Sequence, residues 1–310
     1  MKDTSNCWQW APDPEILTLY GPFKLRWYGL AFLALFYVGY RLIGWQFERA
    51  RRVRGEWPGH SHWRPQLNGQ ELASGFINWA IVGALLGAWL GHRLMYDWDK
   101  VLAQPLYLID IRHGVAGLAS HGGVAGLFVV LALYARKHAI PILEMFDRST
   151  FSTILAVVFI RLGNFMNSEV VGTPTDLPWA VCLPRYDAHA LGPGVLVPRH
   201  PSQLYEVGIG LAVFGLLLLA DRLAGRERRP RGLLTGIVLV AYFSLRFAVE
   251  FVKEHQTLAA DATLTMGQWL SIPFIIAGCA LLVQIARKQF RGQLSPADDH
   301  SDAASSPPES

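Results

Sequence analysis

Charged residues are scarce in this chain. They make up 17% of its 310 residues, whereas soluble domains carry about 25%. Hydrophobic residues reach 52% and the mean hydropathy is +0.25, so the composition is typical of a membrane protein. The long apolar runs also lack the period-2 alternation of barrel strands. Only helices and closed barrels satisfy the backbone in lipid, and we therefore predict an all-α membrane protein.

Cysteines are few as well. The three residues, Cys7, Cys182 and Cys279, lack the spacing of metal ligands, and we expect neither a metal nor a cofactor. Cys279 is interpreted as a small core residue, because free cysteine packs as a small hydrophobic side chain. The sequence leaves open whether Cys7 and Cys182 form a disulfide.

A signal peptide is also not expected, because residues 1–25 contain no basic start that leads into an apolar run. We therefore expect the first membrane segment to direct insertion. The basic residues are spread over several loops, and no nucleic-acid partner is expected.

Seven apolar stretches approach the length of about 20 helical residues that a bilayer core requires. The predicted transmembrane helices cover 27–47, 73–96, 115–135, 150–166, 206–221, 232–252 and 266–286. His121 interrupts the third stretch, and Arg161 interrupts the fourth. The sequence therefore predicts a polytopic protein with seven transmembrane helices.

The charges of the loops predict the orientation. Sixteen Lys and Arg lie in alternate loops and after the last span, against eight on the other side. The positive-inside rule makes the N-terminus extracytoplasmic and the C-terminus cytoplasmic. The predicted organisation is an extracytoplasmic segment (1–26), a catalytic transmembrane domain (27–286) with an extracytoplasmic loop (167–205), and a disordered cytoplasmic tail (287–310).

Two arginines lie well inside predicted spans. An arginine at a helix centre costs roughly 2.5–3.5 kcal/mol, so it normally faces a partner or a watery cavity. Asn164 and Glu169 would share a helical face with Arg161 if the helix continued. Glu250 follows Arg246 at i+4, a spacing that brings the two side chains together. Because guanidinium groups match phosphate geometry, we predict a site for a phospholipid headgroup.

Three further features allow more than one interpretation. The glycines that follow His121 in SHGGVAG (120–126) permit close approach of a helix or of a ligand, and a histidine there is either a packed residue or a general acid/base. In RHPSQLYE (199–206), Ser202 is predicted to cap the helix after Pro201. Tyr28 is either an interfacial aromatic or a ligand contact.

Several of these segments resemble the prolipoprotein diacylglyceryl transferase family. They occur in family order and cover most of the chain from residue 26 onward. The matching segments are RWYGL (26–30), SHGGVAG (120–126), RLGNFMNSE (161–169) with Gly172, RHPSQLYE (199–206), RFAVEF (246–251) and TMGQWLS (265–271).

The resemblance implies an enzyme of the bacterial inner membrane whose active site faces the extracytoplasmic side. It would transfer the diacylglyceryl group of phosphatidylglycerol to the lipobox cysteine thiol of an exported prolipoprotein, forming a thioether and releasing glycerol phosphate. Its partners would be phosphatidylglycerol, the prolipoprotein and membrane lipids. The residues that the family pattern marks as essential are Tyr28, His121, Arg161, Asn164, Glu169, Gly172 and Arg246.

The chemistry of this reaction suggests a role for each side chain. Arg161 and Arg246 would hold the phosphate and offset charge on the leaving oxygen, and His121 would accept the thiol proton. The remaining positions would orient the arginines or bind the headgroup or peptide. Glu169 and Glu250 would orient the arginines. Asn164, Tyr28 and Gly172 would bind the headgroup or peptide.

The chain departs from the family pattern at three positions. Ile160 and Ser168 stand where glycine is common, and so does His92 in LGHR (90–93). These departures leave open a divergent paralogue with altered or lost activity. Intramembrane arginine and histidine also occur in transporters, and a membrane transporter or lipid-binding protein is the other alternative.

Overall fold

The computed structural model describes residues 7–20, 23–54, 68–110, 119–254 and 263–294. Within these ranges, six helices are long and apolar enough to cross a membrane, and the protein is a multi-pass membrane protein. They are α1 (Trp27–Arg54), α2 (Gly69–Tyr96), α5 (Ile142–Asn167), α7 (Ser202–Leu223), α8 (Leu233–Val249) and α9 (Met266–Leu294).

One more long helix, α4 (Ser120–Lys137), corresponds to the third predicted span. It is shorter than five of the others, starts with Ser-His and ends with Arg-Lys, and is not among the six helices that meet the criteria for crossing. The predicted count of seven spans therefore rests on α4.

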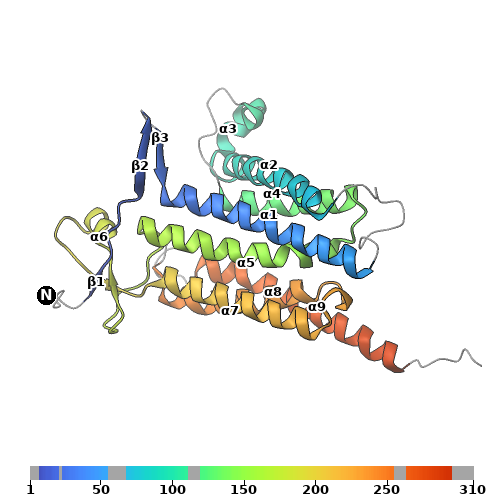
Figure 1. Cartoon of the computed structure of the whole chain (residues 1–310). Helices are drawn as coiled ribbons and strands as arrows, with labels where there is room; N and C mark the ends of the chain where they lie inside the picture. Colours follow the sequence, from blue (N-terminus) through green and yellow to red (C-terminus); the bar gives the residue numbers. More distant parts are fainter. Residues whose placement is uncertain (1–6, 21–22, 55–67, 111–118, 255–262, 295–310) are drawn as a thin grey trace, which may run out of the picture.

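The long helices pack in a row (Figure 1). Along this row α4 packs on α2, α2 on α1, α1 on α5, α5 on α7, α7 on α8 and α8 on α9. Two apolar cores fill it. One is centred on Phe47, Phe76 and Met145, and the other on Phe151, Leu217 and Leu234. The many van der Waals contacts of these buried side chains are expected to stabilise the bundle.

Glycines bring α2 and α4 into backbone contact. A Cβ atom added to Gly126 would lie 2.1 Å from the carbonyl oxygen of Gly83, and one added to Gly122 would lie 2.3 Å from that of Gly87. Small residues at such spacing allow close helix packing in membranes. Of the two interpretations of the SHGGVAG segment, close approach of a helix is therefore confirmed.

Short strands lie at one end of the bundle, which we call the strand end. A parallel pairing joins β1 (Trp8–Gln9) to β4 (Val181–Cys182), and β4 pairs antiparallel with β5 (Pro198–Arg199). A hairpin of β2 (Glu15–Tyr20) and β3 (Phe23–Arg26) precedes α1. The prediction of an all-α fold is therefore correct for the spans and wrong for this end.

A disulfide between Cys7 and Cys182 fastens the N-terminal segment to the loop after α5. Beside it, Trp10 stacks on Phe165 with the ring centroids 4.8 Å apart, and its indole N–H donates to the Phe165 carbonyl. The remaining cysteine, Cys279, is free and exposed on α9, so its interpretation as a core residue is wrong. The question that the sequence left open is thus answered by a bridge close to the end of α5.

Four of the short helices in the described part of the chain also lie at the strand end. They are α3 (Trp98–Ala103), η2 (Pro105–Ile109), α6 (Pro184–Ala190) and, after α8, η4 (Glu250–Val252). Arg93, near the end of α2, donates to the backbone carbonyls of Tyr107 and Asp110 and lies over the Trp89 ring. This intramembrane arginine therefore anchors a surface segment.

The opposite end of the bundle holds a buried ionic network. Arg148 lies between the predicted spans 115–135 and 150–166, and the prediction of a loop there is wrong. The helix α5 begins at Ile142 and contains Arg148, whose side chain is fully buried. Arg148 pairs with Glu144 and Glu227, and Arg49 pairs with Glu227 and Asp221. Burial raises the pKa of Glu227, but Arg148 and Arg49 outweigh it and lower this pKa below its usual value. Charges that were assigned to loops therefore link helices instead.

The predicted tail begins too early. It was placed at 287–310, but α9 continues to Leu294, and the rest of the tail lies outside the described residues. Between α7 and α8 the chain forms η3 (Arg226–Arg228), which carries Glu227 into the ionic network.

Candidate functional site

Two arginines from different helices meet at one buried carboxylate near the strand end. Arg161 Nε of α5 lies 2.8 Å from Glu206 Oε2 of α7, and Arg246 Nη1 of α8 lies 3.3 Å from the same oxygen. Glu206 is 1% exposed, whereas the side chains of Arg161 and Arg246 keep 15% and 21% of their surface. The carboxylate is thus buried, whereas both arginine side chains remain partly accessible.

A lysine and a second carboxylate complete this group. Lys253 Nζ lies 3.3 Å from Glu206 Oε1 and 2.6 Å from Glu250 Oε1. Arg246 Nη2 lies 3.6 Å from Glu250 Oε1, which confirms the pairing predicted from the i+4 spacing. We call these five residues the Glu206 cluster. It holds three cations and two carboxylates.

Asn164 and Glu169 extend the cluster along α5. Arg161 Nη1 donates to Asn164 Oδ1 over 3.1 Å, and Asn164 Nδ2 donates to Glu169 Oε2 over 3.2 Å. The helix does not continue to Glu169 but ends at Asn167, because Ser168 has a left-handed backbone with φ of 56°. Glu169 therefore interacts with Arg161 through Asn164 and lies in an exposed position.

The left-handed turn explains one departure from the family pattern. Glycine adopts positive φ without steric cost, which accounts for a preference for glycine at position 168. Serine fits there, and Val170 also has a positive φ of 57°. A β-branched residue in this conformation is strained, so surrounding contacts must hold the turn.

The segment RHPSQLYE supplies those contacts. Ser202 Oγ donates to the Val170 carbonyl over 3.0 Å, and Gln203 Nε2 donates to the Glu169 carbonyl over 2.7 Å. The prediction that Ser202 caps the helix is wrong, because Pro201 is the N-cap residue and Ser202 begins α7. The same segment then presents Glu206 to the arginines one turn later.

Arg199, the first residue of this segment, holds the surface loop. It is buried, pairs with Asp187 over 3.1 Å and with Glu254, and donates to the Gly172 carbonyl. Tyr186 donates to Glu254, and burial together with this carboxylate raises the pKa of Tyr186 to about 12. This phenol therefore stays protonated at neutral pH.

The segment TMGQWLS seats the second carboxylate of the Glu206 cluster. Thr265 Oγ1 donates to Glu250 Oε2 over 3.0 Å. A Cβ atom added to Gly267 would lie 2.5 Å from Glu250 Cδ. The glycine thus leaves the space that this carboxyl group occupies.

Tyr28 and Gly172 are placed differently. The Tyr28 ring packs on α5 so tightly that a Cβ atom at Gly163 would lie 2.6 Å from Tyr28 Cδ2, and Tyr28 interacts with Arg161, Asn164 and Glu169. Tyr28 thus lies beside three of the predicted site residues, and its role as a ligand contact stays a prediction.

Gly172 contacts backbone. A Cβ atom there would lie 2.3 Å from the His200 carbonyl oxygen and 2.9 Å from that of Val252. It therefore allows three segments to meet beside the Glu206 cluster.

His121 lies in the first turn of α4. Its side chain is outside the described part of the structure. Ile160 and His92, the other departures from the family pattern, are half-buried on α5 and α2, and His92 Nε2 lies 3.9 Å from Asp97.

Sequence reasoning missed Glu206 and Lys253 as site residues. Glu206 is the last residue of RHPSQLYE, and Lys253 follows Glu250 at i+3. A carboxylate near the start of a predicted span could have indicated Glu206, because such a charge needs a partner. Its partner could not be read from the sequence, since the arginines lie on two other helices.

This arrangement suits an anion. The three cations outnumber the two carboxylates, and the two guanidinium groups present accessible donors beside a largely buried setting. Guanidinium donors bind phosphate and carboxylate oxygens in bidentate geometry. The site can therefore hold a phosphate and stabilise additional negative charge on it.

The comparisons with known proteins agree with this chemistry. The family model described as prolipoprotein diacylglyceryl transferase matches residues 14–284. The chain belongs to this family. It is a transferase, as that family is.

Curated relatives share the full length of the match. A phosphatidylglycerol–prolipoprotein diacylglyceryl transferase of Chloroherpeton thalassium is 37% identical over 92% of this chain and 97% of its own. Proteins of the same name from Tolumonas auensis and Nitrobacter hamburgensis are 36% and 38% identical, over 91% and 87% of this chain and 99% and 87% of their own. The similarity thus spans all helices of the row.

Proposed function

We propose that this protein transfers the diacylglyceryl group of phosphatidylglycerol to the lipobox cysteine thiol of exported prolipoproteins. The observation that carries the proposal is the Glu206 cluster, in which Arg161 and Arg246 converge with accessible donors. The donor lipid bears one phosphate and lies in the bilayer beside these helices. The names of the relatives add the identity of both substrates.

The charges of the reaction explain why two arginines are needed. The cysteine sulfur bonds to the glycerol carbon, and the bond from that carbon to the phosphate oxygen breaks. A diester with one negative charge becomes glycerol phosphate with up to two, so charge develops on the leaving oxygen. Preorganised guanidinium donors stabilise this change.

The remaining residues position these groups. Glu206 fixes both guanidinium groups through one oxygen atom. Glu250 pairs with Arg246, and Lys253 pairs with Glu206. Asn164 and Tyr28 lie on the Arg161 side, where they would bind the headgroup or peptide, and Glu169 would orient Arg161 through Asn164. His121, in the first turn of α4, would take the proton of the thiol, since the thiolate is the nucleophile.

The strand end faces the extracytoplasmic side of a bacterial inner membrane in this proposal. A disulfide is typical of an oxidising compartment, and Cys7–Cys182 lies at this end. The basic residues gather at the other end. With α4 as the seventh span, the termini lie on opposite sides.

Orientation can be tested separately from activity. In a Cys279→Ser background, cysteines placed at the exposed positions His189 and Arg228 would be treated with an impermeant maleimide in whole cells. Labelling at position 189 alone supports this orientation. Labelling at 228 alone contradicts it.

Transfer is tested with purified protein, phosphatidylglycerol and a lipobox peptide, by following the release of glycerol phosphate. We expect release that requires the peptide cysteine and is lost in Arg246→Ala. Arg41→Ala is the matched control. Arg41 is exposed on α1, and its guanidinium group donates a hydrogen bond to the Tyr37 hydroxyl. No release from folded wild-type protein, with an active relative alongside, would favour a divergent paralogue, a transporter or a lipid-binding protein.

A further inference from the structure

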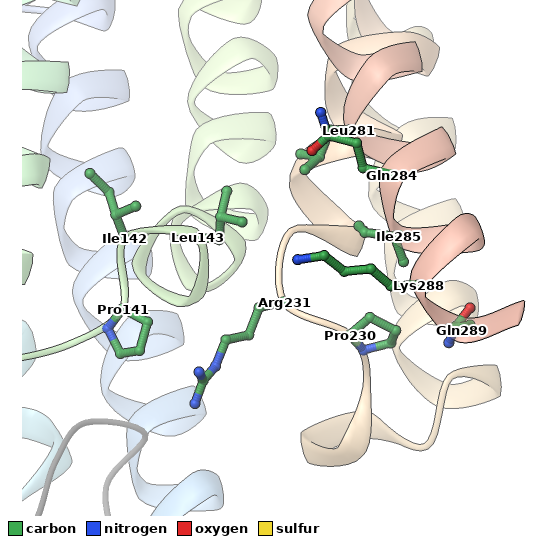
Figure 2. A pocket seen from close by; sticks show the side chains of 10 residues that line it. All are labelled: Pro141, Ile142, Leu143, Pro230, Arg231, Leu281, Gln284, Ile285, Lys288 and Gln289. Atoms are coloured by element: carbon green, nitrogen blue, oxygen red, sulfur yellow. The ribbon is translucent and has the colours of Figure 1, made fainter. Parts of the chain in front are cut away.

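A cavity of about 480 Å³ lies at the opposite end of the bundle, between the start of α5 and the end of α9 (Figure 2). Its size falls within the range of small-molecule sites, about 300–1,000 Å³. The Glu206 cluster lies at the strand end, so this cavity is a separate feature. We call it the α5–α9 pocket. Its lining residues are Pro141, Ile142, Leu143, Pro230, Arg231, Leu281, Gln284, Ile285, Lys288 and Gln289.

The helix packing leaves this space open. The helix α9 packs on α8 at the end of the row. Only 17% of its apolar membrane-spanning stretch is buried inside the protein. The N-terminus of α5 faces α9 across the turn that precedes α8 (Figure 2). The pocket therefore lies at the edge of the bundle rather than in its core.

The floor of the pocket is apolar. Leu143 and Leu281 converge over Gly232, where an added Cβ atom would lie 3.4 Å from Leu143 Cδ1 and 3.2 Å from Leu281 Cδ1. Gly232 has φ of 92°, so glycine is required by the backbone and also keeps the floor clear. Ile142 and Ile285 extend the apolar surface on either side (Figure 2). A hydrocarbon chain fits such a floor.

The rim of the pocket is basic. Arg231 is about half exposed, with 49% of its side-chain surface accessible, although its Nε also pairs with Glu144 over 3.6 Å. Lys288 is exposed on α9 and, in the described part of the chain, makes no ion pair with a carboxylate. Gln284 and Gln289 add amide donors. An apolar floor below two cations is complementary to an amphiphile with an anionic head.

We infer that the α5–α9 pocket binds an anionic phospholipid from the adjacent leaflet. Its phosphate would lie between Arg231 and Lys288, and the first part of an acyl chain would lie over Leu143, Leu281 and Ile285. A free phosphate would satisfy the same cations but would leave this apolar floor exposed to water, so the floor favours the lipid. The site is independent of the transfer reaction proposed above.

The test uses the full-length protein in phosphatidylcholine vesicles that contain a phosphatidylglycerol probe with a photoreactive group in its acyl chain. We expect crosslinks in 141–143 and 281–289, identified by peptide mass spectrometry. Each basic side chain near anionic lipid contributes about fivefold in affinity, so Arg231→Gln with Lys288→Gln should lower the crosslink yield roughly twentyfold. Arg222→Gln with Arg228→Gln is the control of equal charge, since both residues are exposed at the same end.

Three outcomes would overturn the inference. Equal crosslink yields in the two double variants would mean general surface charge. Equal yields with a phosphatidylcholine probe would mean no preference for an anionic head. Loss of the crosslinks on addition of inorganic phosphate, at constant ionic strength, would mean that Arg231 and Lys288 bind free phosphate instead of the lipid.

A further variant keeps the charges intact. Ile285→Trp should fill the floor and reduce crosslinking in 141–143 while Arg231 and Lys288 remain. Unchanged crosslinking in this variant would contradict the proposed position of the chain. Bound lipid in the site of the Glu206 cluster would not interfere, because its crosslinks would fall in other peptides.

Discussion

Replacing Glu206 by glutamine should disturb the site more than replacing any other carboxylate residue of the site by its amide. Glu206 is 1% exposed, and it contacts Arg161, Arg246 and Lys253. Glutamine has nearly the same shape, so the change removes charge and leaves the volume. Three cations would then face only Glu250, whose distance from Arg246 is 3.6 Å.

The magnitude follows from burial. Removing one partner of a buried ion pair costs about 3–5 kcal/mol, because the other charge stays uncompensated. The arginines keep 15% and 21% of their side-chain surface, so water screens part of this cost. We therefore expect Glu206→Gln to lower the free energy of unfolding by about 3 kcal/mol, the lower end of that range.

The stability assay is equilibrium unfolding in mixed detergent micelles, followed by tryptophan fluorescence and far-UV circular dichroism. Glu48→Gln is the control, since Glu48 pairs with Arg51 and Arg52 at the surface and exposed pairs contribute little. Transfer by the folded variant should fall as well, because Arg161 and Arg246 lose their common anchor. Wild-type stability of Glu206→Gln would refute the inference that this carboxylate holds the two arginines together.

Three further predictions concern backbone, packing and charge. Ser168→Gly should stabilise the protein by about 1 kcal/mol, because φ is 56°, and transfer should be retained. Gly126→Ala should cost about 1–3 kcal/mol by overpacking, since its Cβ atom would lie 2.1 Å from the Gly83 carbonyl oxygen. The control Gly208→Ala has nothing within 4 Å and should not destabilise; an equal loss in both would contradict the packing argument. Glu227 has a lowered pKa, so its ion pairs stabilise above the usual value of 4.5 and are lost as the pH falls through the lower folded value. Glu227→Gln should therefore lose stability at neutral pH, and its difference from wild type should shrink below pH 4.5; a difference independent of pH would contradict this.

Local spacing predicted the parts of the site that lie on one helix. Glu250 follows Arg246 at i+4, and their pairing is confirmed. Asn164 follows Arg161 at i+3, and their hydrogen bond is present. Helical periodicity fixes such pairs without knowledge of the fold.

Contacts between helices were beyond this kind of reasoning. Glu206 joins α5 and α8 only because both pack near α7, and no spacing in the sequence encodes that arrangement. The left-handed turn at Ser168 was equally hidden, since serine is not the residue that signals positive φ. For the same reason Glu169 was predicted to share a helical face, although it follows the end of α5.

Hydropathy located the spans well but not their ends. The segment with Glu144, Asp147 and Arg148 was too polar to be included in the fourth span. In the structure these charges satisfy one another and their neighbours inside α5 and η3, so a helix of 26 residues forms where 17 were predicted. Transfer scales treat each residue as unpaired, which explains the early boundary.

The pairing of β1 with β4 also sets an order of assembly. The strand β1 precedes all the long helices in the chain, but the partner of Cys7 lies 175 residues later. The N-terminal segment must therefore wait, unpaired, while α1, α2, α4 and α5 are made and inserted. Only then can Trp10 stack on Phe165 at the end of α5. A segment that is made before all the long helices is therefore among the last to reach its final position.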